Sequence, residues 1–302
     1  TGIIAAIKDN VVGTAGILQR VKVMPIRVFN GENASDSVIV NGINYAAQQK
    51  ELFDSSNGKE GTNICVINMS LGSSGTSSAM DTACQRAMAA GIIVVCAAGN
   101  DGNNGVCVHR MIEGKQDTVY TLLSGYFGSR TRMGKVCAWS KDKKVFNTRL
   151  IVTDTSNGNI VYRSRAYSAT AAGSEGIISS DEDSQLAEYY TGSAKITGSV
   201  DANGVPYSLF DISSLDANEG NYVIGVQYYA PSATELVVWG SQHVYFSRYG
   251  YSWVEGGSAK GSINDIATTD SCISVGSYNS RQYITKLDGT LYHRPLREGE
   301  QL

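Results

Sequence analysis

The 302 residues suffice for one large domain or two ordinary ones, and with 42% hydrophobic and 18% charged residues the chain can bury a core. A net charge of −3 provides no electrostatic footprint for nucleic acid or for an anionic membrane surface. No apolar run is long enough to cross a bilayer and no signal peptide begins at Thr1, so we expect no membrane span.

The N-terminal segment is predicted to contain a helix, a loop and a strand. Residues 1–8 have a helical pattern, and residues 9–16, which include two glycines, are predicted to form a surface loop. The apolar run at 21–29 predicts a strand. Pro25 removes one backbone donor from this strand, which favours a strand start or a sheet edge.

A helix is predicted next, at residues 36–52, with Ser35 or Asp36 as its N-cap. Gly42 in the middle of this helix costs stability relative to alanine, so we expect it to permit close packing on the sheet. The apolar side chains of the helix share one face: Val38, Ile39, Ile43, Ala46 and Ala47.

The clearest pattern is strand, helix, strand and a glycine turn. Residues 65–70 form a short apolar run, residues 77–90 have apolar positions at helical spacing, and residues 92–97 form a second apolar run. Continuous apolar strands of this kind are buried on both faces of a parallel sheet. Asn100 follows on a glycine-flanked turn, where open α/β sheets keep their sites.

After Gly105 the helical periodicity ends and short alternating runs separated by turn residues follow. They indicate an antiparallel sandwich or jelly roll, with hairpin connections at 154–159 and 201–204. The predicted strands are 118–124, 133–140, 149–154, 160–164, 193–200, 222–229, 235–241 and 244–249.

Aromatic residues are frequent between 228 and 253, and alternating aromatics in strands are usually core residues. The alternative is an exposed stacking platform for carbohydrate or peptide. Exposed side chains of Trp239 and Trp253 would favour that alternative.

The six cysteines have no C-x-x-C spacing, so the sequence supports no zinc or redox motif. Buried free thiols that serve as small hydrophobic side chains are the simplest interpretation. A Cys107–Cys137 disulfide remains open at this point. The three histidines have no catalytic or metal-binding context and are interpreted as structural.

Two segments, Ile67-Asn68-Met69-Ser70-Leu71-Gly72 and Ala97-Ala98-Gly99-Asn100-Asp101-Gly102, resemble the subtilisin-like serine proteases (subtilases, peptidase family S8). The first is similar to the substrate-binding strand of that family and the second to the strand end that carries its oxyanion-hole asparagine. Further similar segments lie at 2–6, 23–29, 38–46 and 271–278.

The resemblance implies an α/β fold, a subtilisin-like parallel sheet with helices on both faces, interrupted by an inserted antiparallel β-sandwich or jelly-roll domain. The expected domains are 1–105 for the first part of the core, 106–262 for the insert and 263–302 for the return to the core. Certain clostridial germination proteases of this family carry jelly-roll inserts, an analogy for the fold only.

The resemblance also implies site residues. Asn100 would be the oxyanion-hole donor. Substrate-binding residues would be Ser70, Leu71, Gly72, Ala97, Ala98, Gly99, Glu32, Asn33 and Ala34, although an ordinary αβ loop explains the last three equally well. Asn10 would be a ligand of a structural calcium ion, with an ordinary turn as the alternative. No other cofactor is expected.

The triad motifs of the family, D-[ST]-G, H-G-T and G-T-S-M-A-x-P, do not occur in this sequence. We therefore expect part of a serine endopeptidase that cleaves peptide bonds by acyl transfer, inactive alone and dependent on the remainder of the protease domain. A pseudoprotease or a β-domain binding module without catalysis is the alternative. The expected partner is a peptide or protein substrate, and the family favours a secreted or cell-surface location.

Overall fold

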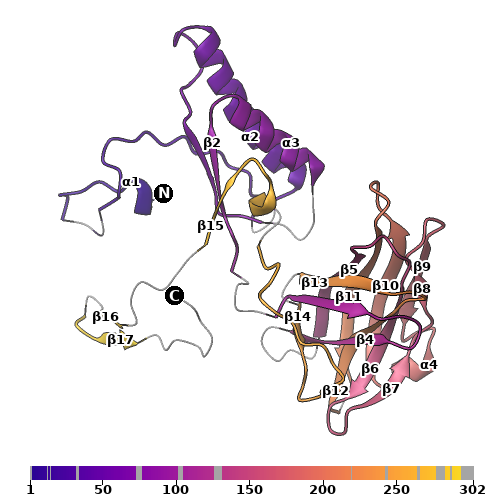
Figure 1. Cartoon of the computed structure of the whole chain (residues 1–302). Helices are drawn as coiled ribbons and strands as arrows, with labels where there is room; N and C mark the ends of the chain where they lie inside the picture. Colours follow the sequence, from indigo (N-terminus) through magenta and orange to yellow (C-terminus); the bar gives the residue numbers. More distant parts are fainter. Residues whose placement is uncertain are drawn as a thin grey trace. The chain divides into compact units, whose positions relative to one another are not determined.

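The structure, a computed structural model, describes all residues except 1, 12, 14, 32–33, 73–76, 101–104, 126–130, 219, 242–243, 264–265, 277–282, 286–287 and 294–302. The chain divides into two compact units (Figure 1). Unit 1 consists of Thr1–Ser70, Gly75–Cys96 and Ile266–Ser274, and unit 2 of Leu71–Ser74, Ala97–Asp265 and Val275–Leu302. Each unit therefore joins segments that are distant in the sequence.

Unit 1 is an α/β unit with a three-stranded sheet of order β1-β2-β15. Strands β1 and β2 are parallel, with Val66 opposite Ile93 and Met69 opposite Cys96. The strands and helices predicted around these residues are confirmed, with ends that differ by a few positions. The elements are α1 (Gly2–Ala5), α2 (Asp36–Ser55), β1 (Val66–Met69), α3 (Ser78–Ala89), β2 (Ile93–Ala97), the 3-10 helix η2 (Ile266–Thr268) and β15 (Ile273–Val275).

Helices α2 and α3 pack against each other through small and apolar side chains. The buried residues are Ile39, Ile43, Ala46 and Ala47 on α2 and Met80, Ala83, Cys84 and Ala87 on α3. An ion pair of two hydrogen bonds also joins them, from Arg86 Nη2 and Nε to the Glu51 carboxylate at 2.7 and 3.0 Å. Both side chains of this pair are largely exposed to solvent, so packing stabilises the helix pair more than the charges do.

The strand predicted at 21–29 is wrong. These residues form no strand, and Pro25 at their centre has no N–H to give to a ladder. Instead they lie against α2: a Cβ on Gly42 would be 2.9 Å from Val28 Cγ1 and 3.2 Å from Ile26 Cγ2. Gly42 thus permits close packing as expected, but against this segment and not on the sheet.

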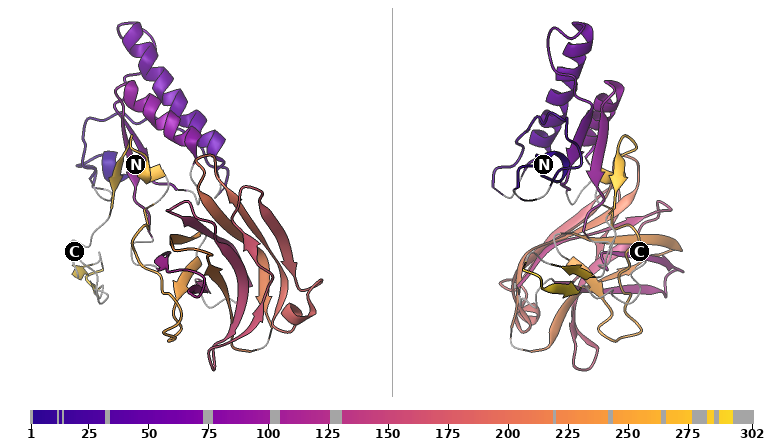
Figure 2. Two further views of the ribbon diagram at one scale, coloured as in Figure 1. Left: turned by 45° about the vertical axis from the view of Figure 1, so that its right-hand side comes forward. Right: turned by 90° about the vertical axis from the view of Figure 1, so that its left-hand side faces the viewer.

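Unit 2 contains two antiparallel sheets, one of order β3-β13-β5-β11-β10-β9 and one of order β14-β4-β12-β6-β7 with β8 paired to β6 (Figure 2). All eight predicted strands are present. The elements are β3 (Cys107–Ile112), β4 (Thr118–Gly125), β5 (Thr131–Ser140), β6 (Asn147–Asp154), β7 (Asn159–Arg163), β8 (Tyr167–Ser168), β9 (Ser174–Ser179), α4 (Ser184–Ala187), β10 (Tyr190–Val200), β11 (Pro206–Ala217), β12 (Tyr222–Tyr229), β13 (Thr234–Ser241) and β14 (Val244–Ser247), followed by a β16 (Tyr283–Thr285) and β17 (Leu291–His293) hairpin.

The two large sheets share one hydrophobic core. Alternate residues of their strands point into it, among them Leu150 and Tyr228 from one sheet and Ile196 and Phe210 from the other. A buried polar pair, Ser140 and Thr234, is satisfied by a hydrogen bond of 2.8 Å between its hydroxyl groups. Side chains of both antiparallel sheets therefore meet in a single core.

A segment after β14 covers the outer face of the β14-β4-β12-β6-β7 sheet. Val254 packs on Leu122, Ile151 and Val223, and the Trp253 ring meets the Tyr120 ring edge-on at 5.2 Å between centroids. Trp253 and Trp239 are both half-buried. The exposed aromatic platform that would favour a carbohydrate- or peptide-binding module is therefore not formed by these two tryptophans.

The β-rich region, residues 105–258, has its two ends held together by backbone contacts, which we call the neck. Cys107 and Ser258 form an antiparallel bridge, and the Phe246 N–H donates to the Gly105 carbonyl at 2.7 Å. A Cβ on Gly257 would clash with the Gly105 carbonyl, so the crossing requires glycine there. The chain thus enters and leaves the two sheets at one place.

Alanine in place of Phe210, which is fully buried, should lower the free energy of unfolding by about 3–5 kcal/mol, because it leaves a cavity in the core that both sheets share. Urea denaturation followed by circular dichroism measures the change. The matched control is Ile177→Ala on β9 of the same sheet, where the side chain is 64% exposed and the cost should stay within about 0.5 kcal/mol. Equal losses in the two variants would contradict the shared core.

Candidate active site

The residues singled out by sequence follow the carboxyl ends of β1 and β2. Because these strands are parallel and Met69 lies opposite Cys96, the chain leaves both strands at the same edge of the sheet. In open α/β sheets this edge is where ligands bind. Ser70 to Gly72 follow β1, and Ala98 to Asn100 follow β2.

Asn100 lies in a bend three residues beyond the end of β2, and its side chain is exposed. Gly99 before it has φ +107°, a backbone conformation that side chains other than glycine rarely adopt. The Ala98 N–H donates to the carbonyl of Val275 in β15 at 2.9 Å. An exposed primary amide at this edge can donate two hydrogen bonds without titrating, which suits it to stabilise an oxyanion.

The predicted substrate-binding residues differ in exposure. Ser70 and Gly72 are exposed, and Leu71 is half-buried. The small residues Ala97, Ala98 and Gly99 are half-buried, as is Ala34. Glu32 and Asn33 lie outside the described residues. The structure places these residues but does not test their roles, which stay predictions.

Asn10 lies exposed in the loop after α1, beside Asp9, whose carboxylate is 3.9 Å from Lys8 Nζ. Within the described part of the chain, no three His, Cys, Asp or Glu side chains converge so as to hold a metal ion. The arrangement of this loop gives the calcium assignment no support beyond the family resemblance. Calcium at Asn10 stays a prediction.

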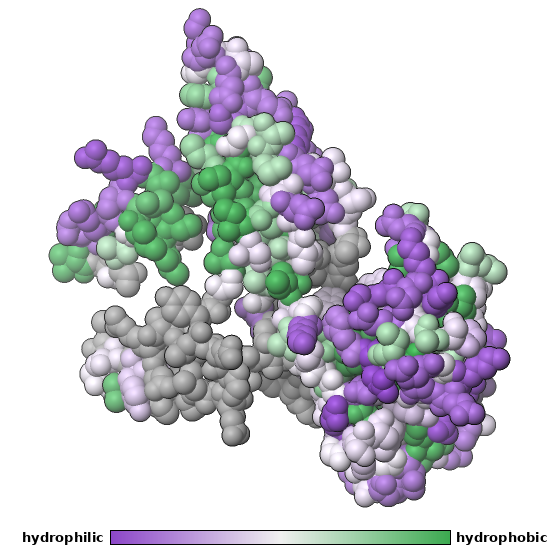
Figure 3. Space-filling model, in the orientation of Figure 1, coloured by the Kyte–Doolittle hydropathy of each residue, from purple (hydrophilic) through white to green (hydrophobic). Residues whose placement is uncertain are grey.

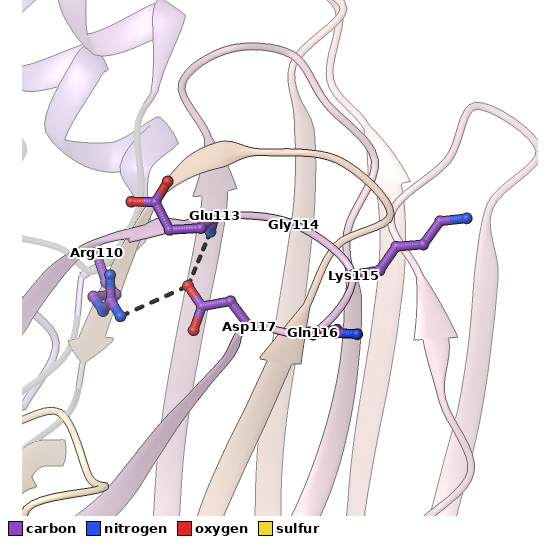
Figure 4. A pocket seen from close by; sticks show the side chains of 6 residues that line it. All are labelled: Arg110, Glu113, Gly114, Lys115, Gln116 and Asp117. Atoms are coloured by element: carbon purple, nitrogen blue, oxygen red, sulfur yellow. Dashed lines mark hydrogen bonds and ion pairs between the residues drawn. The ribbon is translucent and has the colours of Figure 1, made fainter.

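A hollow of about 560 Å³ lies elsewhere, at the turn between β3 and β4 (Figure 4). In it the Asp117 carboxylate accepts from the Glu113 N–H at 2.9 Å and pairs with Arg110 Nη2 at 3.6 Å. Arg110 also pairs at 3.1 Å with Glu255, which does not line the hollow. None of the residues predicted for the active site lines this hollow.

Three of the cysteines, Cys84, Cys107 and Cys137, are poor nucleophiles at neutral pH. Burial raises the pKa values of Cys84, Cys107 and Cys137 to about 11, so these thiols are protonated at neutral pH. No disulfide joins any of the six cysteines. The Cys107–Cys137 disulfide is excluded because Trp239 of β13 lies between them, opposite both, and two strand spacings of about 9.5 Å are too far for a bridge.

The comparison with protein families agrees with the geometry at this edge. The family model of the subtilases (peptidase S8) matches residues 1–290. The chain belongs to the subtilase family. No helix in the described part of this subtilase is long and apolar enough to cross a membrane.

Individual subtilases match part of the chain. Subtilisin DY of Bacillus licheniformis is 40% identical over 105 residues, which are 34% of this chain and 33% of that protein. The major intracellular serine protease of Bacillus subtilis (strain 168) is 36% identical over 104 residues, 34% of this chain and 28% of that protein. The chain thus matches a third or less of the length of these relatives.

A solved structure, that of the Clostridium perfringens CspB protease, is similar to 82% of this chain and 47% of that one, with a TM-score of 0.50 and 17% sequence identity. At this identity the likeness concerns the fold alone. It agrees with a subtilase-like fold that extends through most of this chain.

Val275 was not among the residues predicted for the site. The similarity of 271–278 to the family indicated that this region returns to the core, but not which residue it contacts. The hydrogen bond from Ala98 joins residues on either side of the β-rich region. Only the folded chain brings them together.

The burial of the thiols predicts selective alkylation. At pH 8, iodoacetamide should modify the exposed Cys65 first and leave the buried Cys84 and Cys107 unmodified, because their raised pKa values keep them protonated and their burial excludes the reagent. Peptide mass spectrometry measures the order. Unfolding in urea should equalise the rates, and Cys65→Ser should remove the fast phase. Modification of Cys107 as rapid as that of Cys65 would contradict this burial.

Proposed function

We propose that the protein to which these residues belong is a serine endopeptidase, in which Asn100 donates a hydrogen bond to the oxyanion formed during acyl transfer. The observation that carries this proposal is the exposed Asn100, three residues beyond the end of a parallel strand, in a chain of the subtilase family. Negative charge develops on the scissile carbonyl oxygen as the bond is attacked. A fixed donor aimed at that oxygen lowers the barrier.

The substrate is an extended peptide in this proposal. Ser70, Leu71 and Gly72 would pair with it as an added strand through their backbone groups. The exposure of Ser70 and Gly72 supports this role. Ala97, Ala98 and Gly99 would form a wall of the pocket for the side chain before the cleaved bond, and their small size leaves room for an apolar side chain. Glu32, Asn33 and Ala34 would flank the peptide on its second side.

The nucleophile and the general base would come from the remainder of the protease domain. Exposed apolar side chains in unit 1 support the need for further covering segments (Figure 3). Val66 of β1, Ile93 of β2 and Ile273 of β15 are 52%, 52% and 55% exposed, although sheets of this type normally bury both faces. By itself the chain would then be inactive, since binding groups without a triad retain only residual catalysis.

For the architecture we propose a β-sandwich insert of jelly-roll type within a sheet that carries helices on both faces. The boundaries would be 1–105, 106–262 and 263–302. The neck at Gly105 and Gly257 supports these limits, because it closes the β-rich region close to both of them.

A secreted or cell-surface location and a structural calcium ion at Asn10 complete the proposal and rest on the family alone.

Replacing Asn100 with alanine in the full-length protease should lower kcat and leave KM nearly unchanged, because the donor acts on the oxyanion and not on the bound substrate. In subtilisin, removal of an oxyanion-hole asparagine costs about 10²–10³-fold in kcat, and we expect a loss of that measured size. Steady-state hydrolysis of a peptide substrate measures it. The exposed Asn159 on the β6–β7 hairpin serves as control, and Asn159→Ala should leave kcat unchanged.

Labelling with a fluorophosphonate decides whether the protein is an active serine hydrolase. The full-length protein should label, and the 302-residue chain alone should not. A folded full-length protein that does not label would point to a pseudoprotease. Labelling of the short chain would mean that it carries the nucleophile.

A further inference from the structure

We propose that Gly99 is a positioning residue that aims the Asn100 amide, through its left-handed backbone and the anchored residue before it. The inference rests on the proposed function. From the sequence, Gly99 was expected only to form part of the wall of the substrate pocket. The role proposed here is a separate one and depends on the backbone conformation of Gly99, not on its lack of a side chain.

Ala98, the residue before Gly99, is fixed by a hydrogen bond to the neighbouring strand. On one side of β2 the parallel pairing with β1 reaches Cys96, which lies opposite Met69. On the other side β15 is the neighbour, and the Ala98 N–H donates to the Val275 carbonyl at 2.9 Å (Figure 1). Ala98 is therefore held by a ladder bond beyond the end of β2.

The backbone of Gly99 turns the chain after this fixed residue. Gly99 directly follows this anchor with φ +107°. For a residue with a Cβ this conformation is strained, so a side chain here would push the backbone toward negative φ. Because Asn100 is the next residue, such a change would rotate its amide away from its present direction. A displacement of about 1 Å from the reacting geometry can cost about 10²-fold in rate.

Two substitutions of Gly99 distinguish an effect of its backbone conformation from an effect of side-chain volume in the pocket. In the full-length protease, Gly99→Ala should lower kcat by about tenfold to a hundredfold with a smaller change in KM. Gly99→Asn should retain more of kcat than Gly99→Ala, because asparagine adopts positive φ several-fold more readily. If Gly99 were only a wall of the pocket, the larger asparagine would be the more damaging of the two, and the inference would be overturned.

A double-mutant cycle asks whether Gly99 acts through Asn100. In the Asn100→Ala background, Gly99→Ala should change kcat by less than about twofold, since the amide to be aimed is gone. A full additional loss of kcat in that background would contradict the inference.

Gly91→Ala is the matched control. Gly91 precedes β2, has φ +80° and has open space where the methyl group of an alanine would lie, so this change adds similar backbone strain at the other end of the same strand. It should lower the melting temperature much as Gly99→Ala does and leave kcat intact.

An active wild type with an unaffected Gly99→Ala variant would overturn only this inference. A wild type that neither hydrolyses peptide nor labels with fluorophosphonate would remove the proposed function and this role with it.

Discussion

The parallel pairing of β1 with β2 is the constraint on which the rest of the candidate site depends. Parallel strands cannot be joined by a tight turn, so the chain must cross over, and α3 is that crossover. The register from Val66 opposite Ile93 to Met69 opposite Cys96 brings both strands to an end at one edge. A slip of one residue would turn every side chain of β2 to the other face and move Asn100 away from that edge.

The long β-rich region is accommodated because its two ends lie together. The Gly105–Gly257 crossing and the Cys107–Ser258 bridge close it into one body with a narrow base. Loop closure costs rise only slowly with loop length, so such a region can interrupt a sheet at modest cost if its ends meet. The hydrogen bond from Ala98 to Val275 completes this arrangement, since it joins the residues that flank the region.

Two different kinds of interaction stabilise the β-rich region. Its interior is held by apolar packing between two sheets, with few buried polar groups such as the Ser140–Thr234 pair. Its outer cover, residues 251–255, is held by aromatic contacts and by ions at the rim, where Glu255 pairs with Arg110 at 3.1 Å and Arg248 at 3.5 Å. The packing is the larger contribution, because partly exposed ion pairs are weak.

Periodicity in the sequence predicted many of the elements in their correct order. The helices α2 and α3, the strands β1 and β2 and eight strands of the β-rich region all follow from patterns of period 3.6 or 2. Periodicity missed β3, β8, β9 and β11 of the two large sheets. In β11, a 12-residue strand, a bulge between Ile212 and Leu215 breaks the alternation, and Asp211, paired with Lys135 at 3.2 Å, adds a charge. The sequence pattern placed a strand at 21–29 because an apolar run gives no sign that a partner strand is missing.

By itself the sequence determined the local features of this subtilase: which segments are helix or strand, the turn after β2, and Asn100 as the residue on it. These depend on neighbours in the chain, and so they are visible in a single sequence. The tertiary structure alone decided that 21–29 packs on Gly42, that Cys107 and Cys137 stand on either side of Trp239, and that Val275 anchors Ala98. Each of these depends on which distant segments meet, and that is set by the packing of the whole fold and not by local propensity.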